Sequence, residues 1–324
     1  MVQYSVFSSL FSSKGLKSIV VNQHPMSKKK IFLLISLVIL VLTLFRIGWI
    51  IHHQIPNHPE VEGGVIDLRG WEFSGSQTIT LDGDWAFYPN ELLNPIAGHQ
   101  DHKQAYISLP GNWGAFSNDD TPVHYGTYRV KILLPPRHDQ LYGIRIKDIS
   151  SAASVYVDGQ LIAKVGHPTE SADQYKSKLG TYKAFFHTDR QEIDMTIHVA
   201  NYDNAHEGGM TRSIKLGTEE AISKEVNLSK FMQLLVAMIL LIHSLYALGL
   251  YFMSKHKLQK ELIYFGLLLI FAAFSILVDE DKLFSSLLPI NATWSLKLIY
   301  FSFAGTVFFI LKFIQYVFDL KSLI

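Results

Sequence analysis

The side chains best suited to binding chemistry gather in one short segment, NYDNAHEGG, at residues 201–209. Its amide, carboxylate and imidazole groups can hold hydroxyl groups by hydrogen bonds, and Tyr202 adds an aromatic ring. The segment is polar and ends in two glycines, which is typical of a loop, and loops carry binding residues more often than strands do. A plain polar turn has the same composition, so both interpretations stay open. The candidate polar residues are Asn201, Asp203, His206 and Glu207.

Three further residues complete the candidate ligand-binding set: Trp113, Tyr128 and Arg129. Aromatic rings stack on the C–H faces of sugars, and a guanidinium group near a turn can donate to sugar oxygens. Trp113 and Tyr128 also fit a second interpretation as core residues of strands, because aromatic side chains supply much of the packing in small sandwiches. The polar connection at 173–180, DQYKSKLG, forms a second rim for such a site.

Catalytic chemistry is not indicated. Hydrolysis of a glycosidic bond needs two carboxylates on opposite sides of that bond, whereas Asp203 and Glu207 lie in one loop. The chain has no cysteine, which excludes disulfides, thiol nucleophiles and Cys-ligated zinc. His52, His53 and His58 lie in a linker rich in proline and glycine, where no rigid element fixes metal geometry. We therefore expect no catalytic residue, no metal site and no cofactor.

The charge balance argues against a nucleic-acid partner. Lysine and arginine number 29 against 28 aspartates and glutamates, for a formal net charge of +1. Nucleic-acid binding is typical of domains with a strongly basic surface.

The candidate residues lie in a block with the pattern of an antiparallel sheet, from Leu81 to Gly217. Short runs of valine, isoleucine, tyrosine and phenylalanine alternate with polar residues, and turn residues separate them. In VYVDGQLIAKV, Val155 and Val157 point to one side, and Asp158-Gly159 suits a type I′ turn. The alternation resumes after the turn at Leu161, Ala163 and Val165. Further strands are predicted at 127–134, 142–149, 193–200 and 211–216, with a pair of entering strands in 65–80.

Long apolar runs flank this block. About 20 apolar residues cross a bilayer core, and residues 31–51 meet this length without a cleavage site after them, which predicts a signal anchor. Three further spans are predicted at 231–253, 261–278 and 294–318. The predicted organisation is a tail at 1–30, the anchor, a linker at 52–64, an all-β sandwich at 65–218, a connector at 219–230, a partial bundle at 231–318 and an end at 319–324.

Two charge signals give the same orientation. The run Lys28, Lys29, Lys30 precedes the first span, and the basic connection KHKLQK follows the second, so both are placed in the cytoplasm. The sandwich and the acidic connection DEDKLFSSLLPINA then lie outside. The chain is therefore expected to cross a membrane several times. His243 lies inside a span and is either a functional group or a neutral histidine that faces the bundle and bonds to a neighbouring helix.

Four motifs occur in a fixed order along the sandwich. They are Leu109, Pro110 and Trp113, then Gly126, Tyr128 and Arg129, then Val155 to Gly166, then Asn201, Tyr202, Gly208 and Gly209. In this order they resemble the galactose-binding-like jelly roll that serves as the sugar-binding domain, and not the catalytic domain, of family 2 glycoside hydrolases. The opening LDGDWAFYPNELL, the jelly roll and the spans together resemble bacterial seven-transmembrane receptors with diverse intracellular signalling modules. This resemblance implies a location in a bacterial plasma membrane.

The resemblance implies an extracytoplasmic all-β jelly-roll sandwich plus α-helical transmembrane segments. It also implies a small extracytoplasmic ligand, with carbohydrate as its class. Such receptors have seven spans before a cytoplasmic output module, and only three follow the sandwich here. We therefore expect either a truncated gene product or an output half on another chain, through a signalling partner or a homodimer.

Two classes of function follow from these expectations. One is a membrane-bound sensor that passes ligand binding to its helices. The other is an anchored carbohydrate-binding or cell-envelope module without signalling. A tether needs one span, so the three further spans favour the sensor.

Overall fold

A computed structural model describes residues 28–52, 57–96, 104–117, 122–136, 140–147, 152–178, 180–203, 208–253, 260–279, 281–284, 290 and 292–317. The chain forms two compact units, one up to Ile55 and one from Pro56 onwards. The first unit contains one helix, α1 (Lys28–His52), whose 25 residues confirm a helix at the predicted anchor. At 1.5 Å per residue it is about 37 Å long, which suffices to cross a hydrocarbon core of ~30 Å.

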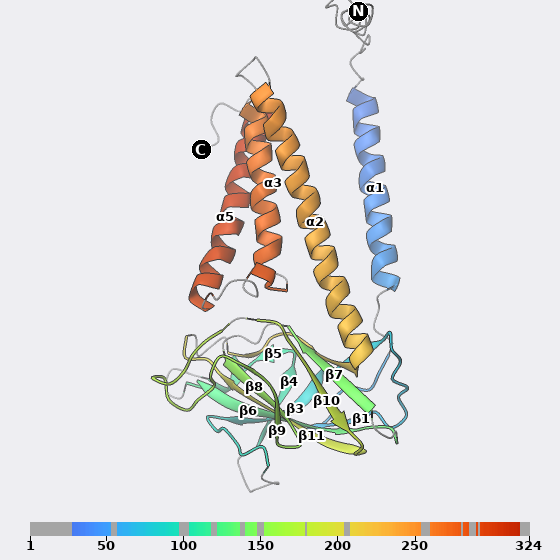
Figure 1. Cartoon of the computed structure of the whole chain (residues 1–324), viewed down its shortest axis with the longest axis vertical. Coiled ribbons are helices and arrows are strands. Elements are labelled where there is room, and N and C mark those ends of the chain that lie inside the picture. The colour runs from blue at the N-terminus through green and yellow to red at the C-terminus, as the bar shows by residue number, and fades with distance from the viewer. Residues whose placement is uncertain are drawn as a thin grey trace, which may run out of the picture. The chain divides into compact units, whose positions relative to one another are not determined.

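The second unit begins with an all-β sandwich, as predicted (Figure 1). Its larger sheet has the order β4-β3-β6-β11-β8-β9 with β1 beside β6, and its smaller sheet has the order β10-β7-β13-β2. A short third pair joins β12 to β5. The strands are β1 (Val65–Asp67), β2 (Thr78–Thr80), β3 (Gly83–Pro89), β4 (Ala105–Leu109), β5 (Gly111–Asn112), β6 (Tyr125–Leu133), β7 (Gln140–Ile146), β8 (Ala152–Val157), β9 (Gln160–Val165), β10 (Tyr182–Thr188), β11 (Glu192–Ala200), β12 (Gly209–Met210) and β13 (Ile214–Thr218).

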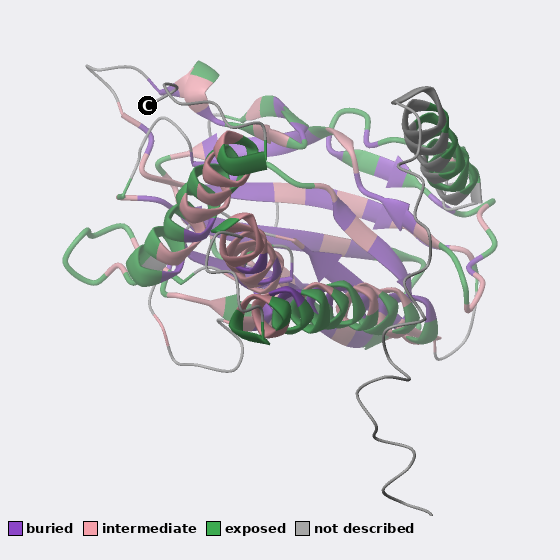
Figure 2. Cartoon of the chain, turned by 90° about the horizontal axis from the view of Figure 1, so that it is seen from above, coloured by how far each residue is buried: buried purple, intermediate pink, exposed green. Residues whose placement is uncertain are grey.

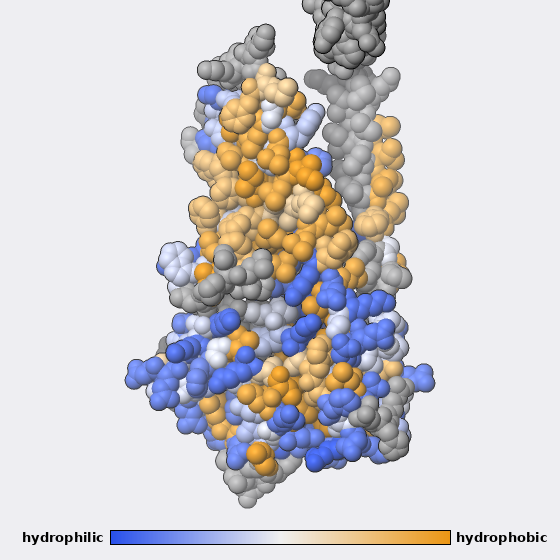
Figure 3. All heavy atoms as spheres, viewed as in Figure 1, coloured by the Kyte–Doolittle hydropathy of each residue, from blue (hydrophilic) through white to orange (hydrophobic). Residues whose placement is uncertain are grey.

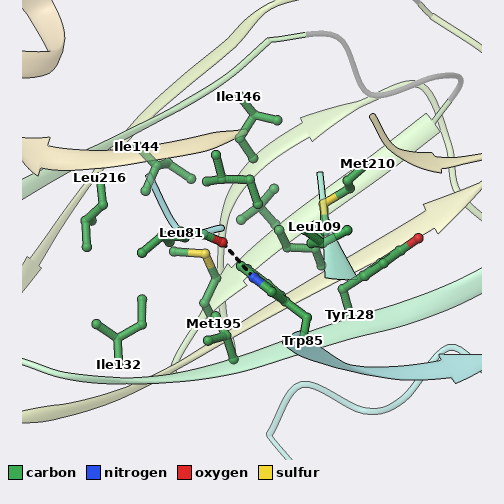
Figure 4. Close-up of a cluster of buried hydrophobic side chains, with 14 of the residues drawn as sticks. Leu81, Trp85, Leu109, Tyr128, Ile132, Ile144, Ile146, Met195, Met210 and Leu216 are labelled. Carbon is green, nitrogen blue, oxygen red and sulfur yellow. Dashed lines mark hydrogen bonds between the residues drawn. The ribbon is translucent and has the colours of Figure 1, made fainter. Parts of the chain in front are cut away.

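The core lies where alternating apolar side chains of the two sheets meet. Along β6, Tyr128, Val130 and Ile132 are buried, while Arg129 and Lys131 face the other side. Ile144 and Leu216 come from the smaller sheet to meet this face (Figure 4). The buried Trp85 satisfies its indole N–H by donating to the carbonyl of Leu81 at 2.8 Å.

The β8–β9 hairpin confirms the predicted turn. Asp158 and Gly159 have φ angles of 48° and 81°, and a type I′ turn needs positive φ at both central positions. The predicted alternation after the turn is wrong at Leu161, which is 48% exposed. An irregularity in the pairing between Val155 and Tyr156 shifts the register and turns this side chain outward.

The two entering strands exist but do not pair with each other. β1 lies parallel to β6, whereas β2 lies antiparallel to β13 in the other sheet. Residues 65–80 therefore cross from one sheet to the other, which local alternation does not reveal.

Within the described residues, three long helices follow the sandwich: α2 (Glu219–Met253), α3 (Lys260–Val278) and α5 (Ala292–Val317). All three are long and apolar enough to cross a membrane. The predicted connector and the span predicted at 231–253 form one continuous helix of 35 residues, because no helix-breaking residue separates them. Ser244 of α2 donates to the carbonyl of Gly266 in α3 at 2.8 Å, where the absent side chain lets the helices approach closely.

The outward faces of these helices are apolar and exposed, while the surface of the sandwich is largely polar (Figures 2 and 3). Exposed apolar surface of this extent is unusual for a soluble protein and is typical of helices that contact lipid.

Candidate functional site

Three aromatic side chains meet around Tyr202 at one end of the sandwich, and we call the four residues together the aromatic rim: His124, Tyr125, Tyr175 and Tyr202. The rings of His124 and Tyr202 stack with centroids 5.0 Å apart and planes 8° apart. Tyr125 lies 6.4 Å from Tyr202, and Tyr175 lies 5.3 Å from it at a steep angle. The rings come from the start of β6, the end of β11 and the β9–β10 connection.

Hydrogen bonds hold these three segments together. The N–H of Asn201 donates to the carbonyl of His124 at 2.6 Å, and the Asn201 side chain accepts from the N–H of Asp203 at 3.1 Å. The hydroxyl of Tyr175 donates to Asp203 at 3.0 Å, and that of Tyr202 donates to the carbonyl of Thr169 at 3.3 Å. The predicted second rim, around Tyr175, therefore lies against the predicted binding loop.

The rim offers neutral donors beside carboxylates. Burial raises the pKa of Tyr125 and of Tyr202, and the nearby Glu170 raises both further. Both hydroxyls therefore stay protonated at neutral pH. The hydroxyl of Tyr125 can donate to a ligand, that of Tyr202 already donates to Thr169, and the exposed Asp203 acts as an acceptor. Half-exposed rings beside such groups suit a neutral ligand with several hydroxyls.

The other predicted site residues do not join the rim. Trp113 and Tyr128 have no exposed surface, so the stacking interpretation is wrong for both, and the core interpretation is right. Both pack against Phe87, with ring centroids 6.1 Å and 4.7 Å away, and Tyr128 lies within the core cluster of Figure 4. Asn201 is also buried, at 4% exposure, so its side chain shapes the loop. His206 and Glu207 lie outside the described residues.

Arg129 lies elsewhere on the same strand as Tyr125. Four residues of strand separate them, which is about 13 Å. Thr127 between them is covered, because its hydroxyl donates to the carbonyl of Glu91 at 2.7 Å and accepts from the N–H of Leu93 at 3.0 Å. The segment that contains Glu91 and Leu93 thus divides the outer face of the large sheet, and Arg129 lines a separate pocket of about 280 Å³.

The structure also describes two further histidines named in the sequence analysis, His58 and His243. No group of three potential metal-binding side chains exists among the described residues. His58 is not a loose linker residue, because its Nε2 lies 3.1 Å from the hydroxyl of Thr80. His243 is exposed on α2 and its Nδ1 lies 2.8 Å from the carbonyl of Ile239 in the same helix. The predicted bond to a neighbouring helix is wrong for His243; its neighbour Ser244 makes that bond.

A buried ionic cluster joins the sandwich to the helices, and the sequence patterns do not reveal it. Arg145 of β7, only 2% exposed, donates to Glu225 of α2 at 2.7 Å and to Asp281 after α3 at 2.6 Å. Lys215 and Thr78 also bond Glu225, at 2.9 Å and 2.8 Å. A further bond to Asp281, of 2.5 Å, comes from Ser229 of α2. We call this set the junction cluster.

The structure shows that β7 buries side chains on both of its faces. Ile144 and Ile146 face the core, and Arg145 between them is buried as well. In an ordinary sandwich strand this arginine would face water, which is what alternation predicts. Its partners are 80 and 136 residues away in the sequence, so no short motif contains them.

Comparisons with known proteins give no family for this chain. No protein family matches the sequence, and no curated protein matches it. Among solved structures, a GH2 beta-galacturonidase from Eisenbergiella tayi is 17% identical over 47% of this chain and 26% of its own, with a TM-score of 0.32. A beta-glucuronidase from Faecalibacterium prausnitzii is also 17% identical, over 44% and 31% of the two chains, with a TM-score of 0.33. One from Bacteroides uniformis is 20% identical, over 43% and 17%, with a TM-score of 0.34.

This chain therefore spans about a quarter of the length of the first of these enzymes.

Proposed function

We propose that the protein is a membrane-bound sensor. Its sandwich lies outside the cytoplasm and binds a neutral saccharide at the aromatic rim, and the three helices carry the resulting change across the membrane. As in the seven-transmembrane receptors that the sequence resembles, the signal passes to an output module or partner chain. The protein has no catalytic role in this proposal.

The junction cluster is the observation that supports signalling over simple anchoring. An anchor needs only a flexible linker between sandwich and membrane. Here Arg145 of the sandwich bonds α2 and the segment after α3 at once, and its charge is buried together with that of Asp281. Since buried ion pairs lose much of their stability when one partner moves away, a shift of β7 is costly unless the helices follow it.

Ligand binding is tested first. The full-length protein in detergent is titrated by calorimetry with neutral mono- and oligosaccharides. We expect modest affinity, because a shallow wet site gains little from burial. Asp203→Ala and Tyr202→Ala should weaken binding by about tenfold or more, since each removes a polar or stacking contact. The control Arg190→Ala changes an exposed side chain elsewhere and should leave binding unchanged.

Signalling is tested by distance measurement between helix ends. The chain has no cysteine, so a pair introduced at Met253 and Val317 can be spin-labelled without background. Both side chains are exposed, at the ends of α2 and α5. The saccharide found above should shift the distance distribution, and Arg145→Met should abolish the shift while binding persists. If the saccharide binds the protein that retains Arg145 but does not shift the distance distribution, the result would favour the anchored module instead.

A further inference from the structure

A second pocket opens on the outer face of the large sheet, beyond the segment that covers Thr127. Its floor is Ala86 of β3, and its volume is about 280 Å³. This lies near the lower end of the range for small-molecule sites, and suits a ligand of monosaccharide size. The lining residues are Gly63, Gly64, Val65, Ala86, Tyr88, Gln104, Tyr106, Arg129, Lys131 and Asp194.

The pocket is hollow because small residues meet there. Gly63 and Gly64 have φ angles of 56° and 78°, which lets the turn before β1 cross the sheet edge. Gly64 donates to the carbonyl of Asp84 and accepts from the N–H of Lys131, both at 2.8 Å. These bonds fix one wall of the pocket beside the short side chain of Ala86.

The polar lining contains a hydrogen-bond donor, on Arg129, that has no acceptor among the described residues. The side chain of Arg129 is 12% exposed, and its one ion pair within the described residues is with Asp194 at 3.3 Å. Its Nε is buried and has no hydrogen-bond partner there. Buried donors in native proteins are nearly always paired, so an unpaired guanidinium N–H beside a cavity indicates a missing acceptor. Lys131 is the second cation of the lining, but its ammonium already pairs with Glu192, so Arg129 is the cation on which anion binding depends.

The opposite wall is aromatic. Tyr106 of β4 is 52% exposed although it lies in the sheet, and Tyr88 lies beside it with its hydroxyl 3.4 Å from Gln104. An exposed ring can stack on the C–H face of a sugar, and Asp194 can accept from a sugar hydroxyl. The guanidinium group matches a carboxylate better than any neutral group, because it donates two parallel hydrogen bonds to it.

We propose that this pocket is a second binding site, which takes a small sugar acid: a monosaccharide ring with a carboxylate. The carboxylate pairs with Arg129, the ring stacks on Tyr106, and a hydroxyl bonds Asp194. The site is separate from the aromatic rim, whose carboxylates suit a neutral ligand, and does not depend on binding there.

The experiment compares two probes that differ only in the acid group. Glucuronate and glucose are titrated separately into the full-length protein in detergent, with calorimetric detection. We expect saturable binding of glucuronate, and binding of glucose that is at least about tenfold weaker at this site, because it lacks the charge-assisted bonds. Arg129→Lys keeps the charge but loses the paired donors, and should lower glucuronate affinity about tenfold. Tyr106→Ala changes an exposed side chain and should also weaken it.

Two controls separate this proposal from the rim. Arg190→Lys alters another arginine that pairs with an aspartate on the surface, and it should leave glucuronate binding unchanged. Asp203→Ala should reduce saccharide binding at the rim but not glucuronate binding at this pocket. A melting temperature equal to that of the unaltered protein shows that each variant is folded. Absence of glucuronate binding, glucose binding of equal strength that persists in Asp203→Ala, or loss of glucuronate binding caused by Asp203→Ala but not by Arg129→Lys would each overturn the proposal.

Discussion

At the scale of single residues, burial decides what each candidate side chain does. Tyr202 and Tyr128 are both tyrosines of the sandwich, yet one is half-exposed in the aromatic rim and the other has no exposed surface. Arg145 and Arg190 differ in the same way: Arg145 is buried between two carboxylates, whereas the side chain of Arg190 is 67% exposed. Loss of an arginine–carboxylate ion pair therefore costs much more stability where the pair is buried than where it is exposed.

The first prediction concerns Arg145. Arg145→Met removes the counter-charge of Asp281, whose side chain is 1% exposed, and leaves that carboxylate buried. Loss of one partner of a buried pair costs about 3–5 kcal/mol, so the melting temperature of the full-length protein should fall clearly. Arg190→Met breaks an exposed pair and should cost about 0–1 kcal/mol. Equal effects of the two substitutions would show that the junction cluster does not hold the sandwich in place.

The second prediction concerns pH. His198 of β11 is 8% exposed, with Nε2 2.8 Å from the carbonyl of Leu93. Burial lowers the pKa of this imidazole below its ordinary value of 6.5, although the bond to Leu93 and the charge of Glu170 oppose the shift. Below pH 6.5 the unfolded chain therefore binds more protons than the folded one, so stability falls as the pH decreases from 6.5 towards the folded pKa.

Thermal unfolding between pH 7 and pH 5 measures this effect. His198→Gln should flatten the dependence, because it removes the group that must be charged on unfolding. His187→Gln, which changes an exposed histidine of β10, serves as the control substitution. A slope that is the same in the His198 variant would assign the pH dependence to other groups.

At the scale of elements, local sequence patterns predict which strands, turns and helices form. The neighbouring elements decide which groups contact each face of a strand or helix. Alternation predicts β6 and β11, and Asp158-Gly159 predicts the turn of the β8–β9 hairpin. The hydropathy pattern divides α2 into a connector and a span, because its first turns are polar and its remainder is apolar. Those polar turns carry Glu225 and Ser229, which bond the sandwich and its neighbour segment instead of water.

The third prediction tests the hairpin. Gly159→Val places a β-branched residue at φ 81°, and its Cβ would lie 2.7 Å from the side chain of Ile96. The left-handed conformation alone should cost about 1–2 kcal/mol. Gly180→Val is the matched control, because a Cβ added there would meet no atom within 4 Å and its φ is not left-handed. Thermal unfolding should show destabilisation by the first change only, and equal melting temperatures would contradict the turn.

At the scale of the whole molecule, the described contacts define which connections share a side of the helices. Asp281, directly after α3, bonds Arg145 of the sandwich. The connection between α3 and α5 therefore lies at the sandwich end of these helices, which agrees with the positions that the charge pattern predicts. The direction relative to the cytoplasm stays a prediction from the lysine distribution.

The fourth prediction tests that direction. Alkaline phosphatase is active only after export, so a fusion after Gly217 should be active, because the sandwich is predicted outside. A fusion after position 257 should be inactive, and one after Ile290 should be active again. The second active fusion depends on the contact between Asp281 and Arg145, so it tests the structure as well as the charge rule. The reverse pattern of activity would refute the sensor orientation and with it the proposed function.

Local signals in the chain suffice for the elements themselves. Alternation marks the main strands, an Asp-Gly pair marks the turn, and apolar runs mark the helices, since each pattern follows from the geometry of one element. The loop of Tyr202 and Asp203 is marked in the same way, because its polarity does not depend on distant partners.

Packing between distant segments settles which faces are covered. It buries Trp113 and Tyr128, pairs β1 with β6, and places Arg145 between carboxylates 80 and 136 residues away. It also leaves Arg129 at the edge of a pocket away from the rim. A period of two fixes the side of a strand on which a residue lies, but what covers that side depends on elements that no local pattern can name.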